Sequence, residues 1–320
     1  MAVGSIRRMA RIFVEGWSPE YGAPLDPDEA LAPAEGSVDT SIETDDWAPR
    51  DGVDDGVARI AFVDGVRRVD ARLTLDDPSG PVPGICGTFA VGAAVWDRGS
   101  RRAWITEERI GRWAVLGGGR AETFPVVALD PPYATATTPD SDPAGLVRTL
   151  HTKMRTAEGH VATALASAGC FVVADGPLNE LAPVPAVGSI KSHRVTYLPP
   201  ERSAVVAALR PRQRTPLFTI SEYRRYSWYV RLAHVPGGHA WSGIVRCEAS
   251  GQLPTGDVIR LADRTAAVLP LVASEPHLDP RAPQNLVPIA ALERQLRHRM
   301  GDRGLVYRAL REAVHERMAS

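Results

Sequence analysis

Two apolar runs, far apart in the chain, each end in an aspartate that is followed by a glycine. The first is Phe62-Val63-Asp64-Gly65 and the second is Phe171-Val172-Val173-Ala174-Asp175-Gly176. Short runs of β-branched and aromatic residues predict buried strands, and an Asp-Gly pair predicts a turn directly after each strand. If these strands are neighbours in a sheet, their terminal carboxylates meet and offer hard oxygen ligands to a divalent cation. The alternative is that each Asp-Gly pair is only a turn.

The order of the expected elements predicts the fold class. Alternating residues indicate an antiparallel meander with strands at 58–64, 66–75, 84–96, 103–116 and 123–129, followed by a loop at 130–141. A helical period then covers 142–167, with Asp142 as the N-cap. Further strands are expected at 170–174, 187–190, 217–220, 226–235 and 241–248, and helices at 200–210, 256–273, 284–300 and 304–317. Strands followed by mixed elements predict an α/β or α+β fold around one central sheet.

Composition narrows the class of protein. The chain has 320 residues, of which 44% are hydrophobic and 23% charged, as in globular proteins that bury a core. The net charge of −1 does not by itself indicate a nucleic-acid partner, but arginines recur within 194–231 and 294–311. The three cysteines lie far apart and predict neither a metal cluster nor a disulfide framework, which favours the cytoplasm. We find neither a run of transmembrane length nor a signal peptide, so no membrane association is expected.

The chain divides into two unequal parts. Residues 1–56 are rich in Asp, Glu, Pro and Gly and predict an N-terminal leader or extended segment. Residues 57–320 carry the strand and helix patterns and predict one domain. The leader also holds Ile12, Phe13, Val14 and Trp17, apolar residues that suggest a protein contact.

A third acidic residue belongs with the two strand-end aspartates. Glu158 lies in the expected helix 142–167, at the border of its apolar stripe. A helix that packs back on its following strand brings such a side chain towards the end of that strand. Asp64, Glu158 and Asp175 would then form the acidic set of a two-metal phosphodiesterase. The alternative for Glu158 is a side chain that extends into solvent.

Residues 220–233 interleave aromatic side chains with arginines. In an extended strand, one face carries Tyr223, Arg225, Tyr229 and Arg231. Such a face can stack bases and hold the phosphates of a single DNA strand. The alternative is a plain amphipathic strand with cation–π pairs.

The order and spacing of these motifs resemble the NurA nuclease family. The resemblance rests on 62–65, on Glu158, on 172–178, on Val187-Gly188-Ser189-Ile190-Lys191-Ser192 and on 279–293, and it covers roughly 58–300. It implies an RNase H-like mixed central sheet flanked by helices. It also implies a cytoplasmic enzyme that hydrolyses DNA with Mn²⁺ (or Mg²⁺), as a homodimer beside a HerA-type hexameric ATPase, in DNA end processing.

The resemblance also implies roles for individual residues. Asp64, Glu158 and Asp175 would be catalytic metal ligands, and Lys191 would contact the scissile phosphate, unless it is only a solvated lysine at a strand end.

The chain departs from the family at the C-terminal Tyr-Pro-x-x-x-x-Ala-His motif. Val287 stands where tyrosine is expected, and no histidine follows at the ligand position. Glu293 is the candidate replacement as a fourth ligand, and the alternative for it is a salt bridge with Arg294 or Arg297. The departure leaves a second function open, a catalytically degenerate docking or regulatory subunit of a DNA-translocating ATPase.

Overall fold

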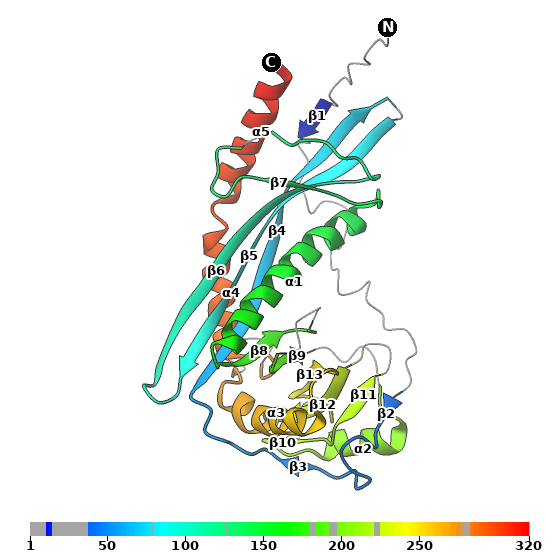
Figure 1. The fold of residues 1–320 in the computed structure, drawn as a ribbon, viewed down its shortest axis with the longest axis vertical. Coiled ribbons are helices and arrows are strands. Elements are labelled where there is room, and N and C mark those ends of the chain that lie inside the picture. The colour runs from blue at the N-terminus through cyan, green and yellow to red at the C-terminus, as the bar shows by residue number, and fades with distance from the viewer. Residues whose placement is uncertain are drawn as a thin grey trace.

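One mixed β-sheet runs through the described chain, and helices cover both of its faces (Figure 1). The computed structural model describes residues 11–14, 38–78, 80–125, 127–178, 184–191, 197–220, 225–275, 277 and 282–319. The strands are β1 (Arg11–Val14), β2 (Val38–Asp39), β3 (Arg50–Asp51), β4 (Arg59–Asp77), β5 (Gly80–Asp97), β6 (Arg102–Leu116), β7 (Ala134–Thr137), β8 (Phe171–Asp175), β9 (Ala186–Ile190), β10 (Gln213–Arg214), β11 (Phe218–Ile220), β12 (Arg225–Arg231) and β13 (Ile244–Ser250). The helices are α1 (Pro143–Ser167), α2 (Pro200–Ala208), α3 (Thr255–Val268), the short 3-10 helix η3 (Leu269–Leu271), α4 (Val287–Arg299) and α5 (Arg303–Ala319).

The sheet combines a long antiparallel part with a parallel centre. β4, β5 and β6 pair antiparallel over most of their length, while β8 pairs parallel with both β4 and β9. Beyond β9 the sheet continues antiparallel through β13, β12 and β11 to β2. The strand order is β2-β11-β12-β13-β9-β8-β4-β5-β6-β7. The predicted α/β class, a mixed sheet flanked by helices, is therefore confirmed.

A β-bulge keeps the apolar side chains of β4 on one face of the sheet, the face that α4 and then α5 cover. Before the bulge, the even-numbered Ile60 and Phe62 pack in the cluster that contains α4. After it, the odd-numbered Leu73 and Leu75 pack against α5. The pairing with β5 shifts at Asp70, which is the extra residue. Because strand side chains alternate with a period of two, one extra residue moves the apolar set by one position without turning it away from the helices.

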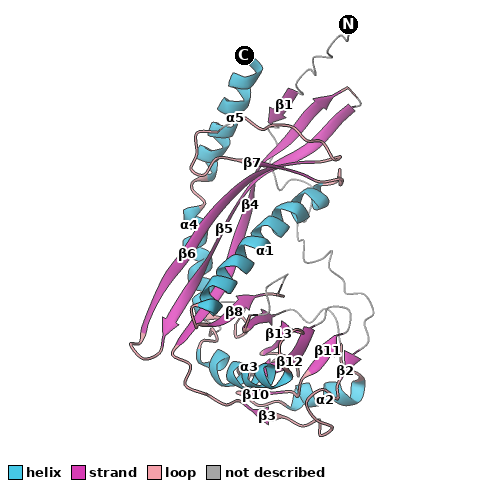
Figure 2. Ribbon diagram, viewed as in Figure 1, coloured by secondary structure: helices cyan, strands magenta, loops and turns pink. Residues whose placement is uncertain are grey.

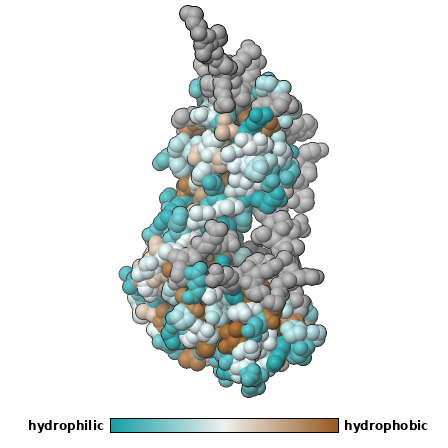
Figure 3. Space-filling model, turned by 45° about the vertical axis from the view of Figure 1, so that its right-hand side comes forward, coloured by the Kyte–Doolittle hydropathy of each residue, from teal (hydrophilic) through white to brown (hydrophobic). Residues whose placement is uncertain are grey.

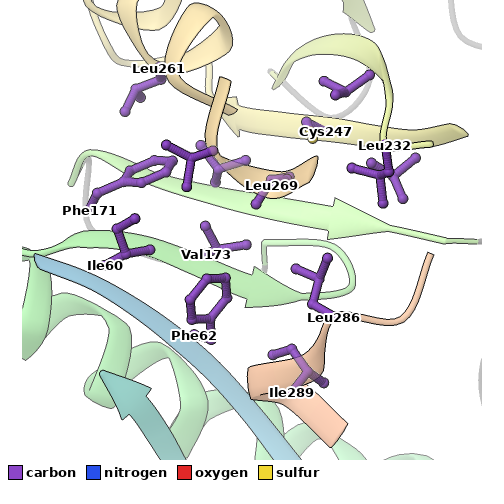
Figure 4. Close-up of a cluster of buried hydrophobic side chains, with 14 of the residues drawn as sticks. Ile60, Phe62, Phe171, Val173, Leu232, Cys247, Leu261, Leu269, Leu286 and Ile289 are labelled. Atoms are coloured by element: carbon purple, nitrogen blue, oxygen red, sulfur yellow. The ribbon is translucent and has the colours of Figure 1, made fainter. Parts of the chain in front are cut away.

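The two faces of the sheet are covered by different helices. α1 lies on one face, where Leu150 and Val161 pack against β4, β5 and β8. α4 and α5 lie on the other face (Figure 1). There, Phe62 of β4 and Val173 of β8 pack with Ile289 of α4 in the largest buried cluster (Figure 4).

The strands beyond β9 form the smaller end of the molecule, with α2 and α3 beside them (Figure 2). Leu261 of α3 packs with Trp228 of β12 in the same cluster as α4. Val206 of α2 belongs to a separate cluster with Phe218 and Tyr229. None of the described helices is long and apolar enough to cross a membrane.

The described part of the expected leader, 1–56, is attached to the sheet. β1 pairs with β4, β2 with β11 and β3 with β10. Trp47 packs in the cluster around α2. Glu43 forms an ion pair with the buried Arg214, with 2.8 Å between Oε2 and Nη1. Long-range contacts therefore order a segment whose sequence shows little periodicity.

Between β6 and α1, the sequence prediction differs from the structure in two places. The described residues of 123–129 form no strand; instead Phe124 and Val127 bury their side chains in the cluster beneath β4 and α5. β7 lies within the expected loop 130–141 and pairs parallel with the end of β6. The apolar residues of 123–129 serve core packing from an irregular segment, a difference that alternation alone does not reveal.

Candidate metal centre

The two aspartates are neighbours, although only Asp175 ends its strand. The turn expected after Asp64 is wrong, because the expected strands 58–64 and 66–75 form one continuous strand, β4, in which Gly65 pairs with Val91 of β5. β4 and β8 run parallel with Val63 opposite Ala174, so Asp64 and Asp175 follow side by side. β8 ends directly after Asp175, because Gly176 adopts a positive φ of 84°. This backbone conformation is strained for a residue that has a side chain. Both aspartates share the face of Phe62 and Val173, the face that α4 covers.

Glu293 of α4 joins the two aspartates from above this face. Among the described residues, Asp64, Asp175 and Glu293 form a group whose ligand oxygens all lie within 4.8 Å of one another. α4 buries Ile289, Leu292 and Leu296 against the sheet, and Glu293 lies beside them on the buried side. Its Oε2 also accepts a hydrogen bond from Arg297, at 3.0 Å. Both sequence interpretations of Glu293, proximity to the aspartates and a salt bridge, are therefore seen together.

Asp64 is buried among other charged side chains. Burial, the largest cause, and the charges of Asp175, Glu158 and Glu293 raise the pKa of Asp64 well above its usual range, while Lys191 opposes this rise. The Gly65 N–H donates to Asp64 Oδ1 at 2.7 Å. A carboxylate in such surroundings is stabilised by a bound cation or by a proton.

Lys191 reaches the centre from the end of β9. Its Nζ donates to Asp175 Oδ2 and to Asn285 Oδ1, both at 2.7 Å. Asn285 is fully buried just before α4, and its carbonyl accepts from the Ser274 N–H. The structure thus places Lys191 at the predicted centre and shows that Asn285 holds it there.

Glu158 lies on the other side of the sheet from Glu293, because α1 covers the opposite face. It approaches β4 at Gly65, where a Cβ would stand 2.4 Å from Glu158 Oε1. Its Oε2 accepts a hydrogen bond from Arg155 Nη1 at 2.7 Å. The structure therefore brings Glu158 beside the centre, but it does not place this side chain in the group formed by the other three carboxylates.

The turn after β8 is held from two directions. Arg155 donates to the carbonyls of Asp175, at 3.1 Å, and of Pro177. From β13, Glu248 Oε1 accepts from the Leu178 N–H at 2.8 Å. These contacts fix the backbone that carries Asp175.

Two residues of the predicted DNA-contacting face, Tyr229 and Arg231 of β12, are not available to a ligand. Tyr229 is 1% exposed and stacks on Phe218, and Arg231 is 7% exposed. The Arg231 guanidinium donates to the carbonyls of Ala207, Leu209, Ala240 and Ser242. Because these carbonyls satisfy the arginine inside the protein, the prediction for Tyr229 and Arg231 is wrong.

The other two residues of that predicted face have different outcomes. Arg225 is half-buried and donates to the Leu178 carbonyl, so it supports the turn after β8. Tyr223 lies outside the described residues.

A buried hydroxyl supports a ligand at this centre. Ser189 of β9 is the register partner of Asp175, and it is 1% exposed. Its Oγ has no hydrogen-bond partner among the described residues, although buried hydroxyls are normally paired. Side-chain alternation places it on the face of Val187, which is also the face of Asp175. An oxygen-only donor set beside an unpaired hydroxyl fits a hard cation with its water ligands.

Sequence reasoning missed Arg155 and Asn285 as members of this region. Arg155 stands one helical turn before Glu158, a spacing that permits an ion pair. Asn285 has no comparable signal, because its contact with Lys191 joins residues that are 94 positions apart.

Comparisons with known proteins add no name to this geometry. No protein-family model matches the chain, and no curated protein matches it.

Proposed function

We propose that this chain is a metal-dependent DNA nuclease of NurA type. The observation that carries the proposal is the meeting of Asp64, Asp175 and Glu293 where β8 ends beside the continuing parallel strand β4. In this proposal, Glu293 would serve as the ligand in place of the histidine that the family motif would supply.

The topology supports an RNase H-like core for this proposal. β6, β5 and β4 are consecutive antiparallel neighbours, and β8 and β9 extend the sheet in parallel beyond β4. α1 leads into β8 on one face, and α4 returns to the other face late in the chain. This arrangement gathers acidic residues from β4, β8 and two helices around the carboxyl end of β8.

The donor set fits a hard divalent ion such as Mn²⁺ or Mg²⁺, because it consists of carboxylate oxygens. Asp64, Asp175 and Glu293 would hold the ion. When bound, it would supply electrostatic stabilisation of the charge that develops on the phosphate during phosphodiester hydrolysis.

The chain's own residues would orient the DNA phosphate. Lys191 carries a positive charge next to Asp175, on a flexible stem, and can turn from that carboxylate to a phosphate oxygen. Asn285 limits its position by a second hydrogen bond.

A catalytically degenerate docking or regulatory subunit of a DNA-translocating ATPase is the second candidate. It is favoured by the internal cations: Lys191 pairs with Asp175 and Arg297 pairs with Glu293. These ion pairs partly neutralise the carboxylates, so a metal ion is less necessary to balance their charge. Cleavage by the purified protein separates the two candidates.

The partners remain proposals that rest on the resemblance: a homodimer beside a HerA-like hexameric ATPase in the cytoplasm. The exposed large hydrophobic side chains of the described residues are Val53, Trp104, Leu271, Val287 and Leu305. On the face shown in Figure 3, hydrophobic residues are interspersed with hydrophilic ones. Sedimentation of the full chain, and of a variant lacking residues 1–20, tests the dimer; a monomer in both cases at high concentration contradicts it.

The deciding experiment is cleavage of labelled DNA by the full chain with Mn²⁺, with Mg²⁺ and with a chelator. We expect cleavage with either ion and none with the chelator. Asp175→Asn should abolish cleavage, whereas Asp76→Asn, the same substitution at an exposed position of β4, should retain it. Cleavage by Asp175→Asn at the wild-type rate, with both variants folded, overturns the assignment.

A further inference from the structure

Arg155 is a buried arginine that the proposed nuclease function does not explain. Its side chain is 9% exposed, on the helix that carries Glu158. Its guanidinium lies 2.7 Å from Glu158 and also donates to the carbonyls of Asp175 and Pro177. Arginines are rarely buried unless they are paired in this way.

We propose that the Arg155 guanidinium takes the place of a second divalent cation, so that the centre holds one ion between Asp64, Asp175 and Glu293. This inference rests on the proposed metal-dependent function and specifies its metal content. It replaces the two-metal arrangement expected from the set Asp64, Glu158 and Asp175.

The geometry separates the four carboxylates into two groups. Asp64, Asp175 and Glu293 lie together on the α4 face, with ligand oxygens within 4.8 Å of one another. Glu158 approaches from the α1 face, at Gly65, and carries a cation of its own. Ions of a two-metal site lie about 3.5–4 Å apart and share a bridging ligand. A second ion bound to Glu158 would therefore have to enter the space beside the Arg155 guanidinium.

The backbone contacts of Arg155 oppose its displacement. Two carbonyls of the turn after β8 accept its hydrogen bonds, and both belong to the segment that positions Asp175. An ion that expelled Arg155 would break these bonds as well as the pair with Glu158. It would also disturb the backbone of Asp175, a ligand of the first ion.

The balance of charge agrees with one ion. Four carboxylates, of Asp64, Glu158, Asp175 and Glu293, face three cations, of Arg155, Lys191 and Arg297. One divalent ion together with the single negative charge of a phosphodiester brings this group close to neutrality. A second divalent ion would leave excess positive charge in a largely buried site, which is unfavourable at short range.

The test is a Mn²⁺ titration of the metal-free full chain, with free Mn²⁺ followed by electron paramagnetic resonance and bound ions counted by native mass spectrometry. We expect one ion per wild-type chain. The Glu158→Gln variant should still bind one Mn²⁺ ion. The Asp175→Asn variant should bind Mn²⁺ at least about tenfold more weakly than the wild type. Arg155→Gln should bind a second ion at raised Mn²⁺, because Glu158 then loses its internal cation.

The results distinguish this inference from the proposed function. Two ions per wild-type chain, or loss of an ion in Glu158→Gln, overturn the inference even if the protein cleaves DNA. One ion without DNA cleavage supports the inference and contradicts the nuclease. If Arg155→Gln does not fold, as judged by circular dichroism, the comparison of wild type with Glu158→Gln decides alone.

Discussion

At the scale of single residues, Asp64 combines burial with close carboxylate neighbours. Burial and these charges raise its pKa, so its charged form destabilises the folded, metal-free protein. Because the folded-state pKa of Asp64 is raised, its contribution to the free energy of unfolding is fully present below the ordinary pKa of 3.8. This contribution is lost as the pH rises through the raised pKa. If the centre binds a metal ion as we propose, the charged form of Asp64 would favour that binding at neutral pH.

We expect Asp64→Asn to stabilise the metal-free protein at pH 8 by about 0.5–2 kcal/mol, and less at pH 5. Mn²⁺ should raise the Tm of the wild type by mass action but leave that of the variant unchanged. Thermal unfolding with and without Mn²⁺ at both pH values measures this. A variant that is less stable than the wild type at pH 8 without metal would contradict the charge argument.

The pKa of Glu43 is shifted in the opposite direction from that of Asp64. Burial acts to raise its pKa, but the hydrogen bonds and charge of Arg214 outweigh burial and hold the pKa below its usual value. A lowered folded-state pKa contributes stability above the ordinary value of 4.5, and this is lost as the pH falls through the folded-state pKa.

Glu43→Gln should destabilise the protein by about 3 kcal/mol at pH 7, because it leaves a buried arginine with fewer charged partners. The difference from wild type should shrink as the pH falls below 4.5. Urea unfolding across pH measures it, with Glu312→Gln, an exposed glutamate of α5, as the control. An equal loss at every pH would show that the effect is not electrostatic.

At the scale of elements, close packing of β9 against the turn after β8 sets the position of Asp175. A Cβ at Gly188 would lie 2.7 Å from the Gly176 carbonyl oxygen and 3.1 Å from the Leu178 nitrogen. Both neighbours are backbone atoms, so the turn itself has to move. Glycine is required here by close approach rather than by its φ angle.

Gly188→Ala should cost about 1–3 kcal/mol in overpacking and weaken Mn²⁺ binding. Gly256→Ala is a matched control, since a Cβ there meets nothing within 4 Å in the first turn of α3. The control should be neutral or slightly stabilising. Denaturant unfolding and a Mn²⁺ titration test both variants. Unchanged Mn²⁺ affinity in Gly188→Ala would show that the position of the turn after β8 does not control metal binding.

At the scale of the whole molecule, we propose that DNA would lie along the exposed side of α4 and α5, because Tyr229 and Arg231 of β12 are buried. The exposed arginines of this side are Arg294, Arg297, Arg299, Arg308 and Arg311. The exposed acidic residues of this side are Asp302, Glu312 and Glu316. Because α4 also carries Glu293, phosphates bound along these helices would lead to the proposed metal centre.

We expect the double variant with Arg308→Glu and Arg311→Glu to bind DNA at least about tenfold more weakly and with a smaller salt dependence. Arg260→Glu, on α3 with a side chain 68% exposed, is the control and should bind like wild type. Fluorescence anisotropy over a range of salt concentrations measures both. Equal losses in the two proteins would indicate a general charge effect and not a defined path.

Local sequence patterns determined much of the centre. The apolar runs before Asp64 and Asp175, and the end of the strand before Lys191, follow from strand periodicity, and the end of β8 follows from Gly176. The helical period placed Glu293 beside buried residues of α4. These features depend on neighbours a few residues away, which is the range over which alternation, helical period and turn chemistry act.

Only the tertiary structure decided which side chains meet. The sequence placed Glu158 in the right helix, but the packing of α1 and α4 on opposite faces of the sheet separates Glu158 from Glu293. Tertiary packing also buries the Arg231 side chain among backbone carbonyls. It places the Arg155 guanidinium against the carbonyls of the turn after β8. The face that a helix covers, and the partner that a buried charge finds, depend on contacts between residues distant in the chain. Local periodicity carries no information about such contacts, because it repeats unchanged whichever face of the sheet is covered.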